Sequence, residues 1–415
     1  MFPLPERFFL FYIGSTKMCG AQVKKEDNTF FEVLRFNEIQ PSGIEKGNVV
    51  QLEHAMQDIR HLKSGIGSSK EFLRFPTYVV LESALTSTYS LNTSLYFNKL
   101  KKIRFSDVQK VIQQTKDVAT LPLSEQIIFS IPQSFKVNDL EGIENPIGLD
   151  GARLAVDLLI GSMNEENWKR FHQVFQKNGI DIENIFSKDI CGGFGAMTQD
   201  ERKGSTLYLD IGGDLTSLVY FRNKNVRRTS WMSFGGESFT QRIQDGLGVT
   251  KKEANYIKEH FGTVQHHEDV FHDEIIPRTF SPENSTATLT ELTQKQLHPI
   301  LINGLNDFME LIQVELDRIE SLETKVEQIV VSGGGARLEG LLESFYKFYD
   351  RPVRLTQPSR IRTRDQSLIQ PEYAAFFGAL RFISEQNSQE KALFSGDLLP
   401  LRVFKTIKTF IRKYF

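Results

Sequence analysis

The chain has 415 residues, 40% hydrophobic and 25% charged, so it has enough apolar material for two or three globular units and is not a disordered chain. Its formal net charge of −2 excludes a global attraction to nucleic acid or to anionic lipid, so any such binding needs a local concentration of charge. Cys19 and Cys191 lie far apart without CxxC spacing, which favours buried, reduced thiols over a disulfide framework.

The N-terminal region lacks the features of an export signal. It has no basic n-region before the apolar run Phe8–Ile13, and no small-residue cleavage site follows that run. No apolar stretch approaches the roughly 18 to 20 residues needed to cross a bilayer. We therefore expect any membrane contact to be peripheral.

Two stretches of the chain repeat one plan of strand, Gly-containing turn and strand. The first stretch runs from Phe8 to Ala21 and the second from Thr206 to Phe221. A further strand-like run follows each stretch, at Phe30–Phe36 and Val226–Phe234. Helical patterns follow each stretch, at Gln51–Lys63 and Ser238–Phe261. This alternation predicts two α/β halves built on related plans.

Composition changes mark further boundaries. Strand-like runs and a helical pattern at Ser106–Ala119 indicate an inserted subdomain, and the polar stretch Thr263–Glu291 indicates an irregular insertion. The polar run Gln386–Lys391 predicts a linker. We expect a first half (1–78 and 163–204) with an insertion (79–162), a second half (205–236 and 302–385) with an insertion (237–301), a linker (386–400) and a terminal segment (401–415).

The two Gly-containing turns have residue types that bind phosphate. A Gly at the tip of a hairpin lets backbone N–H groups approach a phosphate without a Cβ in the way, and hydroxyl groups add donors. The candidate residues are Gly14, Ser15, Thr16 and Lys17 in the first turn and Gly212, Gly213 and Thr216 in the second. Asp210 ends the strand before the second turn, where a carboxylate can hold hydrated Mg²⁺ through water. A simple tight hairpin is the alternative for each turn.

A third Gly-rich element follows the apolar strand Ile329–Ser332 and precedes the start of a helix. It consists of Gly333, Gly334, Gly335 and Ala336. Such a turn leaves space for a flat ring system or a phosphate against the backbone, although a purely structural turn has the same composition. The order of hairpin, hairpin and Gly-rich turn indicates two halves that close on a nucleotide.

With these motifs the chain resembles the actin/Hsp70 superfamily and, within it, the FtsA family. The segments that carry the closer resemblance are Ile13–Lys17, Pro41–Gly47, Asn145–Leu154, Gly235–Thr240 and Lys258. The resemblance covers nearly the whole chain. It implies an α/β, actin-like two-domain ATPase fold with inserted subdomains and a C-terminal amphipathic helix, and a site for ATP and Mg²⁺ to which Gly236, Asn255 and Lys258 also contribute.

Two departures from the family pattern bear on the chemistry. Family members usually carry Asp or Glu where this chain has Tyr12, and Glu where it has Asn255. Asn can still form a hydrogen bond with a ribose hydroxyl. We therefore expect ATP binding with at most weak hydrolysis.

Asp189 is a candidate for positioning water, and a solvated loop residue is the alternative.

The terminal segment Leu401–Phe415 predicts an amphipathic helix. Its apolar face contains Val403, Phe404, Ile407, Phe410, Ile411 and Tyr414, and its basic face contains Arg402, Lys405, Lys408, Arg412 and Lys413. A terminal helix docked on its own domain is the alternative, but docking does not explain five cations without an acid. The pattern favours peripheral binding to anionic lipids.

The resemblance also implies a function. An FtsA-type adaptor receives the C-terminal peptide of FtsZ on its second insertion, self-associates into filaments through its first, contacts later division proteins and works at the cytoplasmic face of the inner membrane. No nucleic acid is implied. The alternatives are a PilM-like adaptor of type IV pilus assembly, which is not expected to have the basic tail, and an actin-fold kinase or phosphatase.

Overall fold

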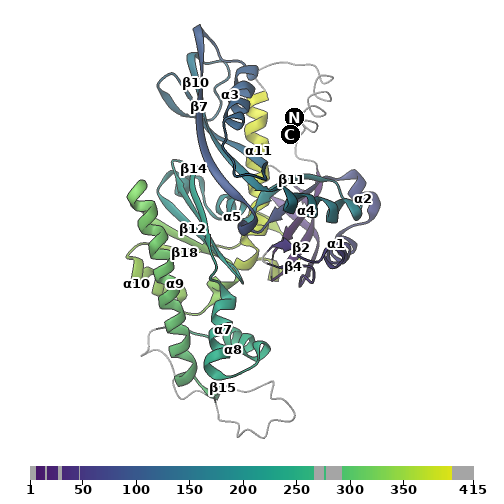
Figure 1. Cartoon of the computed structure of the whole chain (residues 1–415), viewed down its shortest axis with the longest axis vertical. Coiled ribbons are helices and arrows are strands. Elements are labelled where there is room, and N and C mark those ends of the chain that lie inside the picture. Colours follow the sequence, from purple (N-terminus) through teal and green to yellow (C-terminus); the bar gives the residue numbers. More distant parts are fainter. Residues whose placement is uncertain are drawn as a thin grey trace.

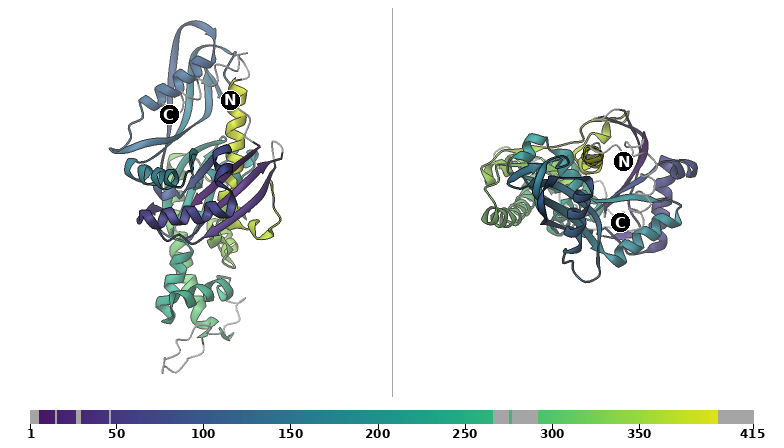
Figure 2. Two further views of the ribbon diagram at one scale, coloured as in Figure 1. Left: turned by 90° about the vertical axis from the view of Figure 1, so that its right-hand side faces the viewer. Right: turned by 90° about the horizontal axis from the view of Figure 1, so that it is seen from above.

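The computed structural model describes residues 6–14, 16–26, 30–45, 47–265, 275–276 and 292–394. The molecule is elongated, and two α/β halves lie next to one another at its centre (Figure 1). The subdomain inserted in the first half lies at one end of the long axis, and helices of the second half extend to the other end (Figures 1 and 2).

The first half is built on a mixed sheet. Its strands are β1 (Arg7–Ile13), β2 (Met18–Lys25), β3 (Phe31–Ile39), β6 (Thr77–Leu81), β11 (Ile182–Ser187) and β19 (Ile361–Arg362). β1, β2 and β3 form an antiparallel meander, and β6 and β11 extend the sheet in parallel on the other side of β1. The short strand β19, which comes from late in the chain, pairs in parallel with β3.

The second half repeats this arrangement. Its strands are β12 (Thr206–Ile211), β13 (Thr216–Arg222), β14 (Asn225–Met232), β17 (Gln328–Ser332) and β18 (Val353–Leu355). The order β14-β13-β12-β17-β18 corresponds strand by strand to β3-β2-β1-β6-β11. The prediction of two α/β halves built on related plans is confirmed.

Helices cover the outer face of each sheet. Those of the first half are α1 (Leu52–Ile66), α2 (Ser69–Arg74) and α4 (Glu165–Lys177), and those of the second are α9 (Gln294–Leu322) and α10 (Leu341–Tyr349). The short helix α6 (Gln199–Lys203) lies beside β13, whereas α7 (Gly236–Leu247) and α8 (Lys251–Phe261) pack on one another and on α9 beyond the sheet. Buried residues of α1 recur every three or four positions, as in Ala55, Ile59 and Leu62, so one stripe of the helix packs on the sheet.

The central strand β1 is buried on both faces. Phe9, Phe11 and Ile13 pack with α1 and α4, whereas Phe8 and Leu10 point to the opposite side, toward the second half. This alternation follows from the two-residue period of a strand. It explains why the strand has a continuous apolar run instead of an alternating one.

The inserted subdomain has a sheet and a core of its own. It consists of β7 (Ser87–Lys102), α3 (Phe105–Asp117), β8 (Glu125–Val137), β9 (Leu140–Ile143) and β10 (Asp150–Asn164). The long strand β10 lies between β7 and β8, and α3 covers one face with Val108 and Val111. The short hairpin of β4 (Ile44–Glu45) and β5 (Asn48–Val49) precedes α1.

The region expected to form the second insertion begins with two helices. Gly248 ends α7 in the left-handed conformation (φ +65°), and the Thr250 hydroxyl accepts a hydrogen bond from Glu253 N at the start of α8. β15 (Ile275–Ile276) then pairs with β16 (Leu292–Thr293). Of the polar stretch expected at 263–291, residues 266–274 and 277–291 lie outside the described residues.

The last described helix differs from the expected linker. α11 (Ala374–Phe394) continues through residues 386–394, where a linker was expected. The polar run there contains Asn and Ser, which are common in loops, but also Gln, Glu and Lys, which favour a helix. The predicted amphipathic helix at 401–415 lies outside the described residues. None of the helices within the described part of the chain is long and apolar enough to cross a membrane.

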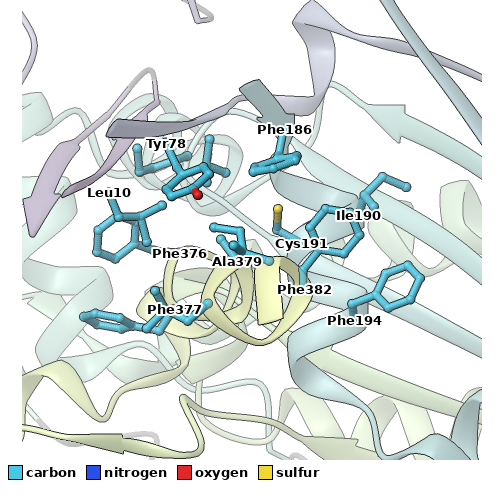
Figure 3. Close-up of a cluster of buried hydrophobic side chains, with 14 of the residues drawn as sticks. Leu10, Tyr78, Phe186, Ile190, Cys191, Phe194, Phe376, Phe377, Ala379 and Phe382 are labelled. Carbon is cyan, nitrogen blue, oxygen red and sulfur yellow. The ribbon is translucent and has the colours of Figure 1, made fainter. Parts of the chain in front are cut away.

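Two helices join the halves at the centre of the molecule. α5 (Lys188–Ala196) and α11 cross between the two sheets, and aromatic side chains surround the crossing (Figure 3). The ring of Phe382 lies 5.2 Å from that of Phe186 and 5.1 Å from that of Phe194. Cys19 and Cys191 are buried free thiols, as predicted.

The backbones of α5 and α11 touch at two glycines. A Cβ on Gly195 would lie 2.1 Å from the Cα of Gly378, and a Cβ on Gly378 would lie 2.6 Å from the carbonyl oxygen of Cys191. Both distances are shorter than van der Waals contact. The helices can therefore cross this closely only because neither glycine has a side chain.

We expect Gly195→Ala to lower the free energy of unfolding by about 1 to 3 kcal/mol, because a methyl group at the crossing forces the two backbones apart. Denaturant unfolding measures this change. Gly304→Ala in α9 is the control, since its methyl group would meet only side-chain atoms, the nearest being Arg242 Cδ at 3.0 Å. Equal losses in both variants would contradict the tight crossing.

Candidate functional site

The tips of the two Gly-containing hairpins face one another across the boundary between the halves. The first tip joins β1 to β2, and the second joins β12 to β13. A Cβ on Gly213 would lie 2.5 Å from Thr16 Cγ2, so the tips are in contact. Gly212 N donates a hydrogen bond to Leu215 O at 2.9 Å and closes the second turn. Ser15 lies outside the described residues.

Helix α7 begins directly on the second hairpin. Gly236 N donates to Gly212 O at 2.9 Å, and Glu237 N donates to Gly213 O at 2.8 Å. A Cβ on Gly235 would lie only 2.3 Å from Gly213 O, so this approach also requires a glycine. The hydroxyl of Thr216 is buried and donates to the backbone, at 2.7 Å from Phe234 O, so it stabilises the hairpin from within.

Lys258 connects the start of α7 to α8. Its ammonium donates to Gly236 O at 3.1 Å, to Thr240 Oγ1 at 2.7 Å and to Asn255 Oδ1 at 2.9 Å. Burial lowers the pKa of Lys258. Asn255, in the place where a carboxylate was expected, therefore serves as a neutral acceptor for this lysine.

The Gly-rich turn after β17 packs against the end of β12. Gly333 has a φ of +90°, and a Cβ there would lie 2.2 Å from Ile211 O. A Cβ on Gly335 would lie 2.4 Å from Ile211 Cγ2, and Ala336 is buried in the core. Gly334 differs, because a Cβ there would meet only the Cβ of Glu372, at 3.7 Å. Of the three glycines, Gly334 alone borders open space.

Lys17 of the first hairpin lies beside Glu38 and Tyr373. Its ammonium lies 3.6 Å from Glu38 Oε2 and 3.8 Å from the centre of the Tyr373 ring. The Tyr373 hydroxyl donates to the same Glu38 oxygen at 2.8 Å. Lys17 thus links the first hairpin to the segment before α11.

A buried group of charged side chains lies below the hairpins. The Lys188 ammonium stands 3.3 Å from Asp210 Oδ2 and 3.6 Å from Glu82 Oε1. The exposed fractions of the side chains are 9% for Lys188, 6% for Glu82 and 1% for Asp210. The Tyr12 hydroxyl donates to Glu82 Oε2 at 2.7 Å. We call these four residues the cleft-floor cluster.

The cluster sets the charge state of its members. Burial and the neighbouring Glu82 carboxylate raise the pKa of Tyr12, so the phenol stays neutral. Burial alone would lower the pKa of Lys188, but the carboxylates of Asp210 and Glu82 raise it well above its ordinary value. Burial raises the pKa of Asp210, and Lys188 opposes part of this change. Lys188 is therefore a fixed ammonium ion.

Asp189, for which the sequence allowed either a water-positioning role or a solvated loop, does not lie in a solvated loop. It lies buried in the first turn of α5, where it accepts hydrogen bonds from the Ser187 hydroxyl and, at 2.8 Å, from Ile190 N. Burial raises its pKa to about 6. Both bonds go to Oδ1, so they hold the Asp189 side chain within the first turn of α5.

The sequence did not identify Glu82 and Lys188 as site residues. Glu82 directly follows β6, and Lys188 directly follows β11. Because β1, β6 and β11 run parallel, their carboxyl ends meet at one edge of the sheet, where sites of α/β proteins form. A charged residue immediately after each fully buried strand end was the available signal.

The residues around Asp210 do not fit the hydrated Mg²⁺ expected there. Mg²⁺ keeps several waters at about 2.1 Å, so a carboxylate that binds it through water must face an open, wet space. Asp210 instead faces the ammonium of Lys188. In the described part of the chain, no group of three or more His, Cys, Asp or Glu side chains could hold a metal ion.

Comparisons with known proteins identify the relatives of this chain. A family model described as cell division protein FtsA matches residues 207–378, and a second, the SHS2 domain inserted in FtsA, matches residues 87–161. Together they cover more than half of the chain. The cell division protein FtsA of Bacillus subtilis (strain 168) is 23% identical over 354 residues, which are 84% of this chain and 77% of that protein.

Solved structures show the fold. The PilM-PilN type IV pilus biogenesis complex has a chain with a TM-score of 0.66 and 15% identity, covering 92% of this chain and 99% of that one. MreB5 of Spiroplasma citri bound to AMPPNP has a TM-score of 0.55 and 12% identity, covering 95% and 100%. The expected actin-like α/β fold is confirmed.

We expect Tyr12→Phe to lower the free energy of unfolding by about 1 to 3 kcal/mol, because the variant leaves a buried oxygen of Glu82 without its donor. Thermal or denaturant unfolding measures the loss. Tyr346→Phe on α10 is the matched control, since that tyrosine is 57% exposed and should change stability little. A Tyr12→Phe variant as stable as the control would show that the hydrogen bond contributes nothing.

Proposed function

The chain belongs to the FtsA family of cell-division proteins as a divergent member, and we propose that it binds a nucleotide between its halves and tethers FtsZ filaments to the membrane. In this role it is an adaptor that self-associates at the cytoplasmic face of the cell membrane, at the division site. The family membership supports the role in division, and the residues described above support the nucleotide site.

The observation that carries the nucleotide site is the meeting of the two hairpins next to Gly334. Backbone N–H groups at two Gly-rich tips suit a polyphosphate, and the space beside Gly334 suits a flat base. The likeness in fold to MreB5, a protein solved with AMPPNP bound, supports a nucleotide as the ligand. ATP is therefore the ligand we propose, placed by Gly14, Thr16, Gly212 and Gly213.

We propose that turnover of this nucleotide is slow. Transfer of a phosphoryl group needs a base or a water-positioning residue with access to the reacting phosphate, together with cations that stabilise the transition state. Tyr12 is neutral, Asp210 is paired with Lys188, and Asp189 accepts hydrogen bonds within its own helix turn. The buried carboxylates near the hairpins are therefore engaged within the protein.

The membrane and FtsZ contacts rest on the sequence and on family membership. The basic amphipathic segment 401–415 is the proposed anchor on anionic lipid. Each large apolar side chain buried there contributes about 1.5 to 3 kcal/mol, and each basic residue near an anionic surface about 1 kcal/mol. The second insertion (237–301) is the proposed receptor for the FtsZ C-terminal peptide, and the first (79–162) is proposed to contribute to self-association.

A PilM-like role in pilus assembly is the second candidate, because a chain of the PilM-PilN complex shares the fold. That likeness concerns the fold alone, whereas the FtsA models match the sequence itself. An actin-fold kinase or phosphatase is the third. Rapid ATP turnover that depends on a small acceptor would identify such an enzyme and would contradict the adaptor.

We expect the protein to bind ATP and Gly334→Phe to weaken binding by roughly 10- to 100-fold, because the ring enters the space proposed for the base. Isothermal titration calorimetry measures both. Gly334→Ala is the control, since its methyl group meets only Glu372 Cβ at 3.7 Å and should leave the affinity nearly unchanged. Absence of ATP binding to the unaltered protein would remove the nucleotide from the proposal.

We expect FtsZ from the same organism to float with anionic vesicles only when this protein is present. Phe404→Glu with Phe410→Glu should abolish flotation of both proteins, since it removes about 3 to 6 kcal/mol of apolar burial, roughly 100-fold or more in partitioning. Thr406→Glu with Thr409→Glu adds the same charge to the basic face and is the matched control. Equal flotation of the two double variants would exclude the tail as an apolar anchor.

The same assay locates the FtsZ contact. Ile276 pairs with Leu292 across β15 and β16, so a short Gly/Ser linker can replace 277–291 without changing the packing of either residue. This variant should still float but carry less FtsZ. Undiminished FtsZ on the vesicles would place the contact elsewhere on the chain.

A further inference from the structure

We infer that the side chain of Lys188 is the resident cation of the cleft floor and occupies the place that a divalent metal ion would need between Asp210 and Glu82. The inference deepens the proposed nucleotide site, on whose location it rests. It changes what that site requires, because the charge next to the hairpins belongs to the protein and does not arrive with a ligand.

The first support is the position of the ammonium group. It stands between two carboxylates from different halves of the molecule, 3.3 Å from Asp210 Oδ2 in β12 and 3.6 Å from Glu82 Oε1 after β6. Within the described residues, neither of these two buried oxygens accepts a hydrogen bond. Their negative charge is therefore balanced mainly by the charge of Lys188.

The second support is that the other two lysines described near the hairpins, Lys17 and Lys258, have closer partners of their own. Lys17 lies beside Glu38 and the ring of Tyr373. Lys258 donates to Gly236 O, Thr240 and Asn255 in α7 and α8. A buried carboxylate without a counter-charge is strongly destabilising or takes up a proton, so the pair stays ionised only with Lys188 or a metal ion beside it.

The third support is the fourth member of the cluster. Tyr12 takes the place of the acidic residue expected at the end of β1, and its neutral hydroxyl donates to the other oxygen of Glu82. A carboxylate at this position would add a third negative charge to a group that contains one cation. A neutral Tyr12 is therefore compatible with a single cation, Lys188, in the cluster. The two carboxylates that would bind a metal ion already have Lys188 and Tyr12 as partners.

A titration with Mn²⁺ in the absence of nucleotide tests the inference. Electron paramagnetic resonance reports bound Mn²⁺. We expect the unaltered protein to have no Mn²⁺ site that depends on Asp210, so the Asp210→Asn variant should give the same signal. Its melting temperature should be the same in EDTA and in millimolar Mg²⁺. One Mn²⁺ bound in an Asp210-dependent way would overturn the inference. Because no nucleotide is added, failure to bind ATP would not affect this result.

Lys188→Met is the decisive variant, because it removes the charge and keeps much of the side-chain volume. We expect its melting temperature to fall by several degrees in EDTA, and Mn²⁺ or Mg²⁺ to restore part of the loss as one Mn²⁺ binds. Lys188→Arg keeps the cation and should bind no Mn²⁺. A Lys188→Met protein that is as stable as the original and insensitive to metal would contradict the role of Lys188.

A double variant covers the case in which Lys188→Met does not fold. Lys188→Met with Asp210→Asn removes one positive and one negative charge together. It should be more stable than Lys188→Met in EDTA and should bind no Mn²⁺. A double variant that is no better folded than the single one would show that charge balance is not what Lys188 supplies.

Discussion

The close crossing of α5 and α11 is the constraint on which the rest of the structure depends. Gly195 and Gly378 let the two backbones touch, and rings such as Phe382 fill the space around the crossing. Packing of this density allows little sliding, because neighbouring side chains are already in contact. Since α5 begins at Lys188, the same contact fixes where the ammonium stands between Glu82 and Asp210. The charge distribution of the cleft floor is therefore a consequence of the way the halves are joined.

Burying the charged groups of the cleft-floor cluster costs free energy, and this cost is offset only when all of its members are present. A buried ion pair seldom stabilises a protein more than well-packed apolar residues would, whereas an incomplete pair is strongly destabilising. Tyr12 helps to complete the cluster, since its raised pKa keeps it neutral and its hydroxyl gives Glu82 a hydrogen-bond donor without adding a charge. A group with this balance is better explained by the need to hold charge at one place in the cleft than by a gain in stability.

The fold was predictable from local patterns, and the cleft floor was not. Two apolar runs, Phe8–Ile13 and Thr206–Ile211, and the Gly-containing turns after them indicate the paired halves. Such strands and turns can be predicted because they depend on residues that are neighbours in the sequence. The ion pair of Lys188 with Asp210 joins two elements whose proximity depends on the crossing of α5 and α11. The loss of a carboxylate at Tyr12 was visible in the sequence, but its partner Glu82, 70 positions away, was not.

A cation that is part of the chain has a consequence for how the cleft can respond to ligands. A ligand shifts a conformational equilibrium only by the difference between its affinities for the two states. A metal ion that arrives with a nucleotide and leaves with the product changes the attraction between the halves at each exchange. Lys188 is covalently attached, so its attraction to Asp210 in the other half is present with or without nucleotide. This arrangement suits an adaptor whose halves keep one relation while it holds its partners, more than an enzyme that opens and closes with each turnover.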